Sequence, residues 1–183
     1  VGDYLRGIAP AEVWDIGANT GIFSRLATDV GARVVSIDND PGPVDINYRQ
    51  VVAEGESNLY PIVADLTNPS PSLGWENRER SALLDRGPTD TVMALALVHH
   101  LAISNNVPFS RLASFFARLC RTLIIEFVPE GDPKVKRLLS MRDHDFPGYT
   151  REAFEAAFSG SFQISRRDQI EGSGRILYLM VKR

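Results

Sequence analysis

Residues that suit ligand binding and proton transfer follow four apolar segments of the sequence. In chain order they are the segment 15–21 (DIGANTG), Asp38 with Asn39, Asp65 with Leu66, and His99 with His100. Carboxylates accept hydrogen bonds from hydroxyl and amino groups, glycine turns let backbone N–H groups approach a ligand, and histidine exchanges protons near neutral pH. The sequence therefore indicates a polar binding site next to a candidate proton carrier.

The segment 15–21 has the composition of a turn that joins a strand to a helix. Gly17 permits a tight turn, and Gly21 lets the helix begin close to the sheet. The free backbone N–H groups at a helix start can receive a polar group of a ligand. The stricter G-x-G-x-x-G pattern of dinucleotide-binding turns is absent. Taken alone, the segment predicts either a ligand-binding turn or a turn that only connects two elements.

The acids after the second and third apolar segments suit the sugar and the base of a nucleoside. Asp38 lies 21 residues after Gly17, near the spacing of about 20 at which an acid accepts ribose hydroxyls. Asp65 could accept the amino group of an adenine. Each acid also has a simpler interpretation, because Asp38 begins an Asp-Asn-Asp-Pro turn in which Asp40 caps a helix, and Asp65 could be a solvated loop residue.

Three titratable residues are candidates for moving a proton. His99 and His100 are neighbours, so their side chains point in different directions, and we expect one of them to face the site. Glu126 interrupts the apolar segment 122–128, and a buried carboxylate needs a partner. Each of the three could instead have only a structural role. A metal site built from one of these histidines with His144 and Glu126 is a weaker alternative, and we expect no metal.

The apolar segments and the stretches between them predict an α/β fold. Strands are expected at residues 13–16, 33–37, 59–64, 91–98 and 122–128, with helices between most of them. Residues 162–169 and 175–181 are expected to form a C-terminal antiparallel β-hairpin. Right-handed crossovers place helices on both faces of a parallel sheet, and ligands bind at the carboxyl ends of its strands. The four polar groups would therefore meet at one edge of a doubly wound sheet.

The segment from Leu66 to Pro88 departs from this alternation. Its prolines and glycines predict a loop, with a short helix near residues 78–84. We interpret Trp75 in this segment as a loop anchor, or alternatively as part of the pocket that holds a second substrate. The first interpretation predicts that the side chain packs onto the body of the domain.

Composition limits the class of protein and of partner. The 183 residues, 44% of them hydrophobic, suit a single domain, either a processed chain or a piece of a longer one. A net charge of −3 lacks the positive balance of nucleic-acid-binding domains, so we expect no nucleic-acid partner. The single cysteine, Cys120, excludes an internal disulfide, and no apolar stretch approaches the ~20 residues of a membrane span. These features favour a cytoplasmic protein.

Four motifs, DIGANTG, VVSIDND, PIVADL and ALALVHHL, together resemble those of the class I S-adenosylmethionine-dependent methyltransferases. The resemblance covers essentially the whole chain, so it implies that residues 1–183 are one cofactor-binding domain. It implies a Rossmann-like, mostly parallel seven-stranded sheet with its last two strands antiparallel. Asp15, Gly17 and Gly21 match the glycine motif that holds the methionine part of S-adenosylmethionine. Asp38 matches the ribose-binding acid, and Asp65 matches the adenine-side acid.

The resemblance extends the expected cofactor site to neighbouring residues. Asn39 follows the ribose-binding acid and Leu66 follows the adenine-side acid, and we assign both to cofactor binding. Many members of the family have a third glycine where Asn19 stands. Asparagine tolerates the left-handed backbone better than other non-glycine residues, so we expect cofactor binding to be retained.

The resemblance implies methyl transfer to an oxygen or nitrogen of a small-molecule or carrier-bound acceptor. Because the sulfur leaves as a neutral group, the protein mainly aligns the reactants and can remove a proton from the acceptor. His100, then His99, then Glu126 are the candidates for that base. Three alternatives stay open: a methyltransferase-like domain that binds without catalysis, an RNA methyltransferase, and a nicotinamide-dependent oxidoreductase.

Overall fold

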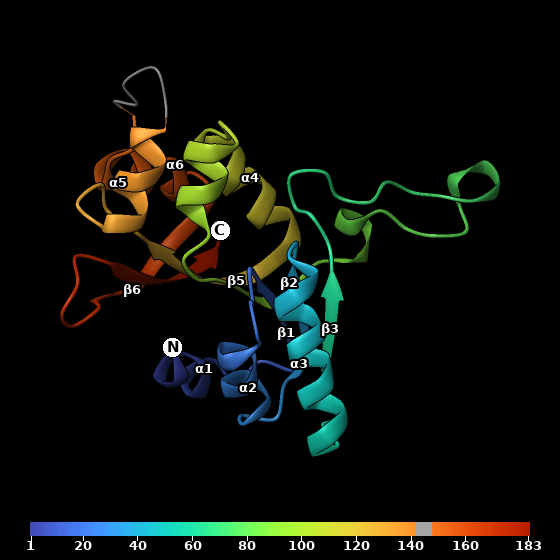
Figure 1. Ribbon diagram of the computed structural model, residues 1–183. Helices are drawn as coiled ribbons and strands as arrows, with labels where there is room; N and C mark the ends of the chain where they lie inside the picture. The colour runs from blue at the N-terminus through green and yellow to red at the C-terminus, as the bar shows by residue number, and fades with distance from the viewer. Residues whose placement is uncertain (142–147) are drawn as a thin grey trace.

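The strands form one mixed sheet. The computed structural model describes residues 1–141 and 148–183. Within these ranges the strands are β1 (Glu12–Ile16), β2 (Arg33–Asp38), β3 (Leu59–Val63), β4 (Thr89–Ala94), β5 (Cys120–Phe127), β6 (Phe162–Gln169) and β7 (Ile176–Lys182). They lie in the order β3-β2-β1-β4-β5-β7-β6 (Figure 1). The first five strands pair in parallel, and β7 is antiparallel to both β5 and β6. The predicted fold class is confirmed.

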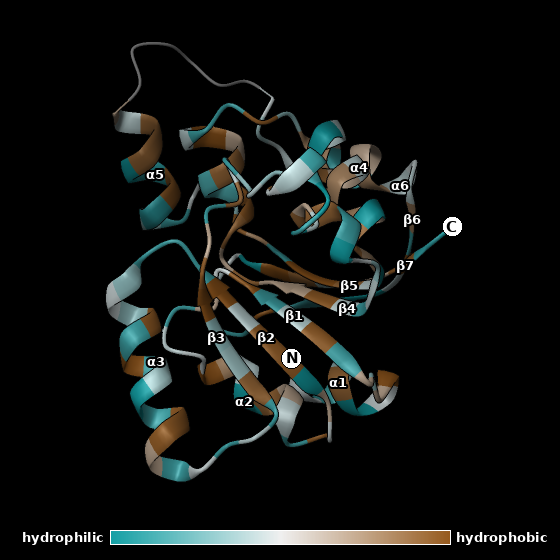
Figure 2. Cartoon of the chain, turned by 90° about the vertical axis from the view of Figure 1, so that its right-hand side faces the viewer, coloured by the Kyte–Doolittle hydropathy of each residue, from teal (hydrophilic) through white to brown (hydrophobic). Residues whose placement is uncertain are grey.

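Helices cover both faces of the sheet (Figure 2). On one face lie α1 (Gly2–Ile8), α2 (Ile22–Thr28) and α3 (Pro41–Glu54), and on the other lie α4 (Phe109–Leu119), α5 (Pro133–Ser140) and α6 (Arg151–Ser159). Successive strand residues point to opposite faces, so Val34 and Met93 belong to the core beneath α1 and α2. Trp14 and Val92 belong to the larger core beneath α4 and α6.

Three helices begin at side chains that act as caps. Asp40, Asp132 and Thr150 each accept a hydrogen bond from a backbone N–H two or three residues later. These bonds satisfy N–H groups that have no partner inside the helix. Pro41 and Pro133 stand at the first positions of α3 and α5, where the missing N–H of proline costs nothing. The cap that the sequence predicts at Asp40 is confirmed.

The fourth strand is shorter than predicted. β4 ends at Ala94, whereas the sequence pattern extended it to residue 98. Ala96 adopts a left-handed φ of 48°, which ends the extended backbone, and the His100 N–H then donates to the Leu97 carbonyl at 3.0 Å. A π-helical turn, η3 (His100–Ser104), follows. Periodicity could not locate this end of the strand, because the residues up to 98 are mostly buried and apolar.

The N-terminal helix α1 is a second difference from the prediction. Its seven residues are too few to display a helical period, so the sequence pattern does not reveal it. Tyr4 and Leu5 are buried, and the Tyr4 hydroxyl donates to the Leu177 carbonyl at 3.2 Å. No helix in the two described ranges is long and apolar enough to cross a membrane.

The segment between β3 and β4 contains two short 3₁₀ turns, η1 (Trp75–Asn77) and η2 (Leu83–Arg86). The single helix predicted near residues 78–84 is therefore wrong. In Figure 1 this segment leaves the end of β3, runs away from the body of the molecule and returns to it. As a result, no helix stands between β3 and β4 to cover the sheet.

Candidate functional site

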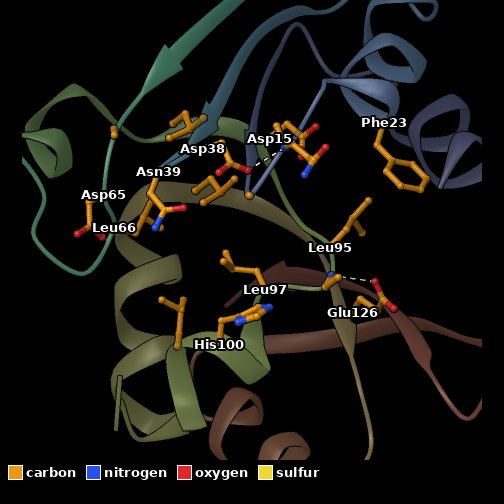
Figure 3. A pocket seen from close by; sticks show the side chains of 18 of the residues that line it. Asp15, Phe23, Asp38, Asn39, Asp65, Leu66, Leu95, Leu97, His100 and Glu126 are labelled. Carbon is orange, nitrogen blue, oxygen red and sulfur yellow. Dashed lines mark hydrogen bonds between the residues drawn. The ribbon is translucent and has the colours of Figure 1, made fainter. Parts of the chain in front are cut away.

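A cavity of about 740 Å³ opens at the carboxyl edge of the sheet. Its size lies within the range of small-molecule sites. Nine of the eleven residues predicted for the site line it: Asp15, Gly17, Asn19, Asp38, Asn39, Asp65, Leu66, His100 and Glu126. Figure 3 shows the side chains of Asp15, Asp38, Asp65 and His100 arranged around one space. Gly21 and His99 do not line the cavity.

The turn after β1 has the backbone that its residues favour. Gly17, Asn19 and Gly21 have positive φ angles of 78°, 52° and 77°. The Gly17 N–H donates to the Ile37 carbonyl at 2.8 Å, which fixes the turn to the end of β2. Gly21 packs against Asn47, and a Cβ at this position would lie 2.5 Å from the Asn47 amide atoms. Gly21 therefore allows the turn to pack closely against Asn47 and does not face the cavity.

Asp38 lies at the end of β2 with both carboxylate oxygens bonded to the backbone. Its Oδ2 accepts from the Asn19 N–H at 2.8 Å, and its Oδ1 accepts from the Asp40 N–H at 3.0 Å. A carboxylate offers about four acceptor directions, so two remain for further donors. Asn39 lies beside it at the cavity (Figure 3). This arrangement can accept two adjacent hydroxyl groups, such as those of a ribose.

Asp65 begins the loop after β3 and lines the same cavity with Leu66. Its Oδ1 accepts hydrogen bonds from the Thr67 hydroxyl at 2.7 Å and from the Thr67 N–H at 2.8 Å. These bonds, the hydroxyl bond foremost, lower the pKa of Asp65, so the group is ionised near neutral pH. Leu66 and Leu97 add apolar surface. A carboxylate beside apolar side chains suits a flat base that carries an amino group.

Asp15 is a buried residue of the cavity lining. It is 2% exposed, and its Oδ2 accepts from the Ser24 hydroxyl at 2.6 Å. Burial raises the pKa of Asp15 to about 7, although the Ser24 hydrogen bond acts in the opposite direction. A nearby positive charge favours the ionised form of a carboxyl group. Asp15 can therefore become negatively charged when a cationic group of a ligand approaches.

The two histidines have different surroundings. His100 lines the cavity, and His99 is fully buried beside it, with 4.2 Å between the ring centroids. Neither ring nitrogen of His99 has a hydrogen-bond partner among the described residues. Burial, with a smaller contribution from His100, lowers the pKa of His99 to about 3, so this ring stays neutral. Burial and then Lys134 lower the pKa of His100. Of the two, His100 is placed to take a proton from a bound molecule.

Glu126 is held by two partners. Its Oε2 accepts from the Ala96 N–H at 2.8 Å, and its Oε1 accepts from Arg175 Nη1 at 3.1 Å. Arg175 Nε also donates to Asp132 Oδ2 at 2.7 Å. The carboxylate therefore ties the strained turn after β4 to the C-terminal hairpin and to the start of α5. Since both of its oxygens are bonded, Glu126 is better suited to positioning this turn than to accepting a proton.

Most of the other residues that line the cavity have no signal in the sequence. They come from α2, η3, the start of α5 and the hairpin, and they include Phe23, Ser104, Asn105, Lys134, Ile170 and Arg175. Arg175 lies 49 residues from Glu126 in the chain, so only folding brings the two together. The sequence did indicate that such a partner exists, because a carboxylate inside an apolar strand, here Glu126, requires one.

Two alternative roles can be compared with the structure. Within the described ranges, no group of three or more His, Cys, Asp or Glu residues is placed to hold a metal ion. His144, which the metal alternative needs, lies outside the described residues. Trp75 is 79% exposed and is not among the residues that line the cavity. Both roles predicted for Trp75, loop anchor and pocket residue, are therefore wrong.

Sequence comparison finds a relative of greater length. No protein-family model matches the chain. The chain is 38% identical over 179 residues to the nodulation protein NoeA of Rhizobium meliloti (strain 1021), an alignment that covers 97% of this chain and 37% of NoeA. The chain therefore spans little more than a third of the length of that relative.

Structure comparison finds methyltransferases. Magnesium protoporphyrin IX methyltransferase (ChlM) from Synechocystis PCC 6803, solved with bound SAH, matches with a TM-score of 0.68 and 20% identity, over 100% of this chain and 80% of ChlM. WbdD, a bifunctional kinase–methyltransferase, matches with a TM-score of 0.65 and 18% identity, over 98% of this chain and 37% of WbdD. At these identities the likeness shows a shared fold.

Proposed function

The chain has the fold of the class I S-adenosylmethionine-dependent methyltransferases, and we propose that it binds S-adenosylmethionine and methylates an oxygen or nitrogen of a small-molecule or carrier-bound acceptor. One observation carries the proposal: a single cavity joins the glycine turn, Asp38, Asp65 and His100 at the carboxyl edge of this sheet. S-adenosylmethionine would supply an electrophilic methyl group on a positively charged sulfur.

The residues of the cavity fit the parts of this cofactor. Gly17, Ala18 and Asn19 line the cavity where the methionine part would lie, and Asp15, whose pKa is raised by burial, can become negatively charged beside a positive group. The two unused acceptor directions of Asp38 suit the ribose hydroxyls. Asp65 with Leu66 suits the adenine. A cofactor that is cationic in one part and a nucleoside in the other uses all of these features.

His100 is the residue that we propose removes a proton from the acceptor. It lines the cavity, and its lowered pKa keeps it neutral and able to accept a proton at pH 7. General bases contribute about 10²–10⁴-fold to a rate. The link from Glu126 to the Ala96 N–H holds the turn that leads into His100. Glu126 is therefore proposed as a positioning residue.

Polar residues other than the nucleoside-facing acids also line the cavity, and they suit a polar acceptor. Ser104, Asn105 and Lys134 line it together with His100 and Arg175. Arg175 is paired with two carboxylates, whereas Lys134 forms no ion pair within the described residues. A cavity lining with hydroxyl, amide and ammonium groups favours an acceptor rich in hydroxyl, amine or anionic groups over a flat apolar acceptor.

Calorimetric titration tests the cofactor assignment. We expect S-adenosylmethionine and S-adenosylhomocysteine to bind and NADH not to bind. Asp38→Asn keeps the shape of the side chain but replaces one acceptor oxygen by a donor, so it should weaken both ligands at least about tenfold. Asp45→Asn, an exposed carboxylate on α3, is the matched control and should leave the affinity unchanged.

Two results would contradict this assignment. Binding of NADH with no binding of S-adenosylmethionine would indicate an oxidoreductase. Absence of binding by any of the three ligands to the folded chain would remove the cofactor from the proposal.

The acceptor class has a separate test. Methyl transfer to RNA but not to small or carrier-bound acceptors would keep the cofactor and reject the acceptor class.

A further inference from the structure

The segment between β3 and β4 contains an ordered hairpin that projects from the body, and we name residues 70–86 the arm. Leu73 and Arg80 exchange two backbone hydrogen bonds of 3.0 and 3.1 Å. Closer to the body, the Ala82 N–H donates to Ser72 Oγ at 3.2 Å and the Leu83 N–H donates to the Ser70 carbonyl at 3.3 Å. Every residue from 73 to 81 is exposed. The arm therefore holds its shape through its own bonds while its surface stays uncovered (Figure 1).

The tip of the arm carries a large apolar side chain in water. Trp75 is 79% exposed, and Leu73 beside it is 41% exposed. Exposing an indole forfeits the burial of about 150–250 Å² of surface, and tryptophan is among the residues that most often anchor interfaces. An ordered loop that presents tryptophan at its tip is suited to insert that side chain into a pocket of another molecule.

A pocket of this kind exists at the base of the arm. It has a volume of about 430 Å³ and is lined by residues of β1, β2 and β3 and of the segment after β3, where no α-helix follows to cover that part of the sheet. Its lining is mainly apolar: Trp14, Val35, Ile37, Tyr60, Ile62, Ala64, Pro69 and Leu83. A cavity of about 150 Å³ holds a benzene molecule, so this groove has room for an indole. Tyr60 and Ile62 remain 47% and 40% exposed.

The charges on the arm are complementary in an antiparallel arrangement. Glu79 and Arg80 lie toward the tip, and Asp85 and Arg86 lie toward the base. Two such arms that run antiparallel bring the tip of one toward the base of the other, in a register where Glu79 can pair with Arg86 and Arg80 with Asp85. None of these four side chains forms an ion pair within the part of the chain that the structure describes. Arg86 also lines the groove.

We propose that two copies of this chain form a symmetric dimer in which the arms lie antiparallel and each Trp75 enters the groove at the base of the other arm. A two-fold axis between antiparallel arms brings each tip to the other base, which satisfies both contacts at once. The same step buries Trp75 on one copy and Tyr60 and Ile62 on the other. It also pairs the four charges, each with an opposite charge of the second copy.

Sedimentation equilibrium and tryptophan emission of the 183-residue chain test the dimer. We expect a concentration-dependent dimer, with an emission maximum that shifts to shorter wavelength as the dimer forms. Trp75→Ala should raise the dissociation constant about 30-fold or more, the effect of losing a central interface residue, and should abolish the spectral shift. Tyr48→Ala, which removes an exposed aromatic side chain on α3, is the matched control and should change neither quantity.

A charge exchange tests the antiparallel register. Glu79→Arg alone and Arg86→Glu alone should each weaken the dimer about tenfold, because each places like charges opposite one another. The double variant should recover most of the affinity, which misfolding or a general charge effect would not produce. Binding of S-adenosylmethionine should be unchanged in all of these variants, since none of the substituted residues lines the cofactor cavity. A chain that stays monomeric at several hundred micromolar would overturn the proposal. So would a dimer whose dissociation constant does not change in Trp75→Ala.

Discussion

At the scale of single residues, Asp15 shows how the site controls charge. The carboxyl group is buried, and its pKa of about 7 lies well above the value of about 3.9 in an unfolded chain. Below pH 4 the group is protonated in both states. As the pH rises from about 4 to about 7, the unfolded chain loses this proton while the folded chain keeps it. Stability must therefore fall across this window and then stay level with respect to this group.

The Asp15→Asn variant tests that sign. Asparagine is uncharged at every pH, so the variant should lose the fall in stability that Asp15 causes between pH 4 and pH 7. Near pH 7 the variant should be more stable than the parent by up to roughly 4 kcal/mol, from a shift of about three pKa units. Urea unfolding at several pH values measures the difference, with Asp45→Asn as the exposed control. A constant offset at all pH values would contradict a buried, protonated Asp15.

His100 makes a prediction about catalysis at the same scale. In an assay with an acceptor that the parent methylates, His100→Gln should lower kcat by about 10²–10⁴-fold. It should leave the affinity for S-adenosylmethionine unchanged. Only neutral histidine accepts a proton, so kcat/KM of the parent should rise with pH through a value below the ordinary pKa of about 6.5. The variant should lack this rise. Equal turnover by both proteins would exclude His100 as the base.

At the scale of elements, the site depends on a link between three of them. Arg175, directly before β7, donates hydrogen bonds to Glu126 on β5 and to Asp132 at the cap of α5, and Glu126 also accepts from the turn after β4. The hydrogen bond to Arg175 is the main cause that lowers the pKa of Asp132. The antiparallel hairpin therefore does more than complete the sheet, since it supplies the cation that pairs with two carboxylates, one of which lines the cavity.

Arg175→Met should break this link. The side chains of Glu126 and Asp132 are 7% and 10% exposed, and that of Arg175 is 21% exposed. Loss of a fully buried partner costs about 3–5 kcal/mol. Partial exposure reduces this, so we expect a loss of roughly 2 kcal/mol in the free energy of unfolding. The double variant Arg175→Met/Glu126→Gln should recover part of it, because glutamine can still accept from Ala96. Denaturation that shows no coupling between the two sites would contradict the link.

At the scale of the whole molecule, the aromatic core beneath α4 and α6 holds the C-terminal half together. Phe154 on α6 is fully buried and lies 4.4 Å from Phe158, 5.2 Å from Phe127 and 5.4 Å from Tyr178, measured between ring centroids. These rings belong to α6, β5 and β7. The hairpin that provides Arg175 is therefore attached to the sheet through this core.

Phe154→Ala should destabilise the whole domain. Removing a buried phenylalanine side chain costs about 3–5 kcal/mol, because it loses apolar burial and leaves a cavity. We expect a lower Tm with a single cooperative transition by circular dichroism and by tryptophan fluorescence. Tyr48→Ala, at an exposed position on α3, should leave the Tm within about 1–2 °C of the parent. Two separate transitions in the variant would show that the aromatic core stabilises only part of the chain.

The sequence by itself determined the features that depend on neighbouring residues. Alternating apolar segments predicted the α/β fold, Asp40 marked the start of a helix, and Gly17 with Gly21 marked the turn after β1. Each of these follows from local backbone and hydrogen-bond preferences. The positions of Asp38 and Asp65 at the cavity followed as well, because parallel strands place their carboxyl ends at one edge.

Only the tertiary structure decided the features that depend on contacts between distant segments. It buried His99 and left His100 at the cavity, since two adjacent side chains are sorted by what packs around them. It joined Glu126 to Arg175, which engaged the carboxylate that the sequence left open as a base. It also extended the arm away from the body, so Trp75 is exposed where the sequence predicted packing. Burial and pairing are properties of the assembled chain, and no local pattern encodes them.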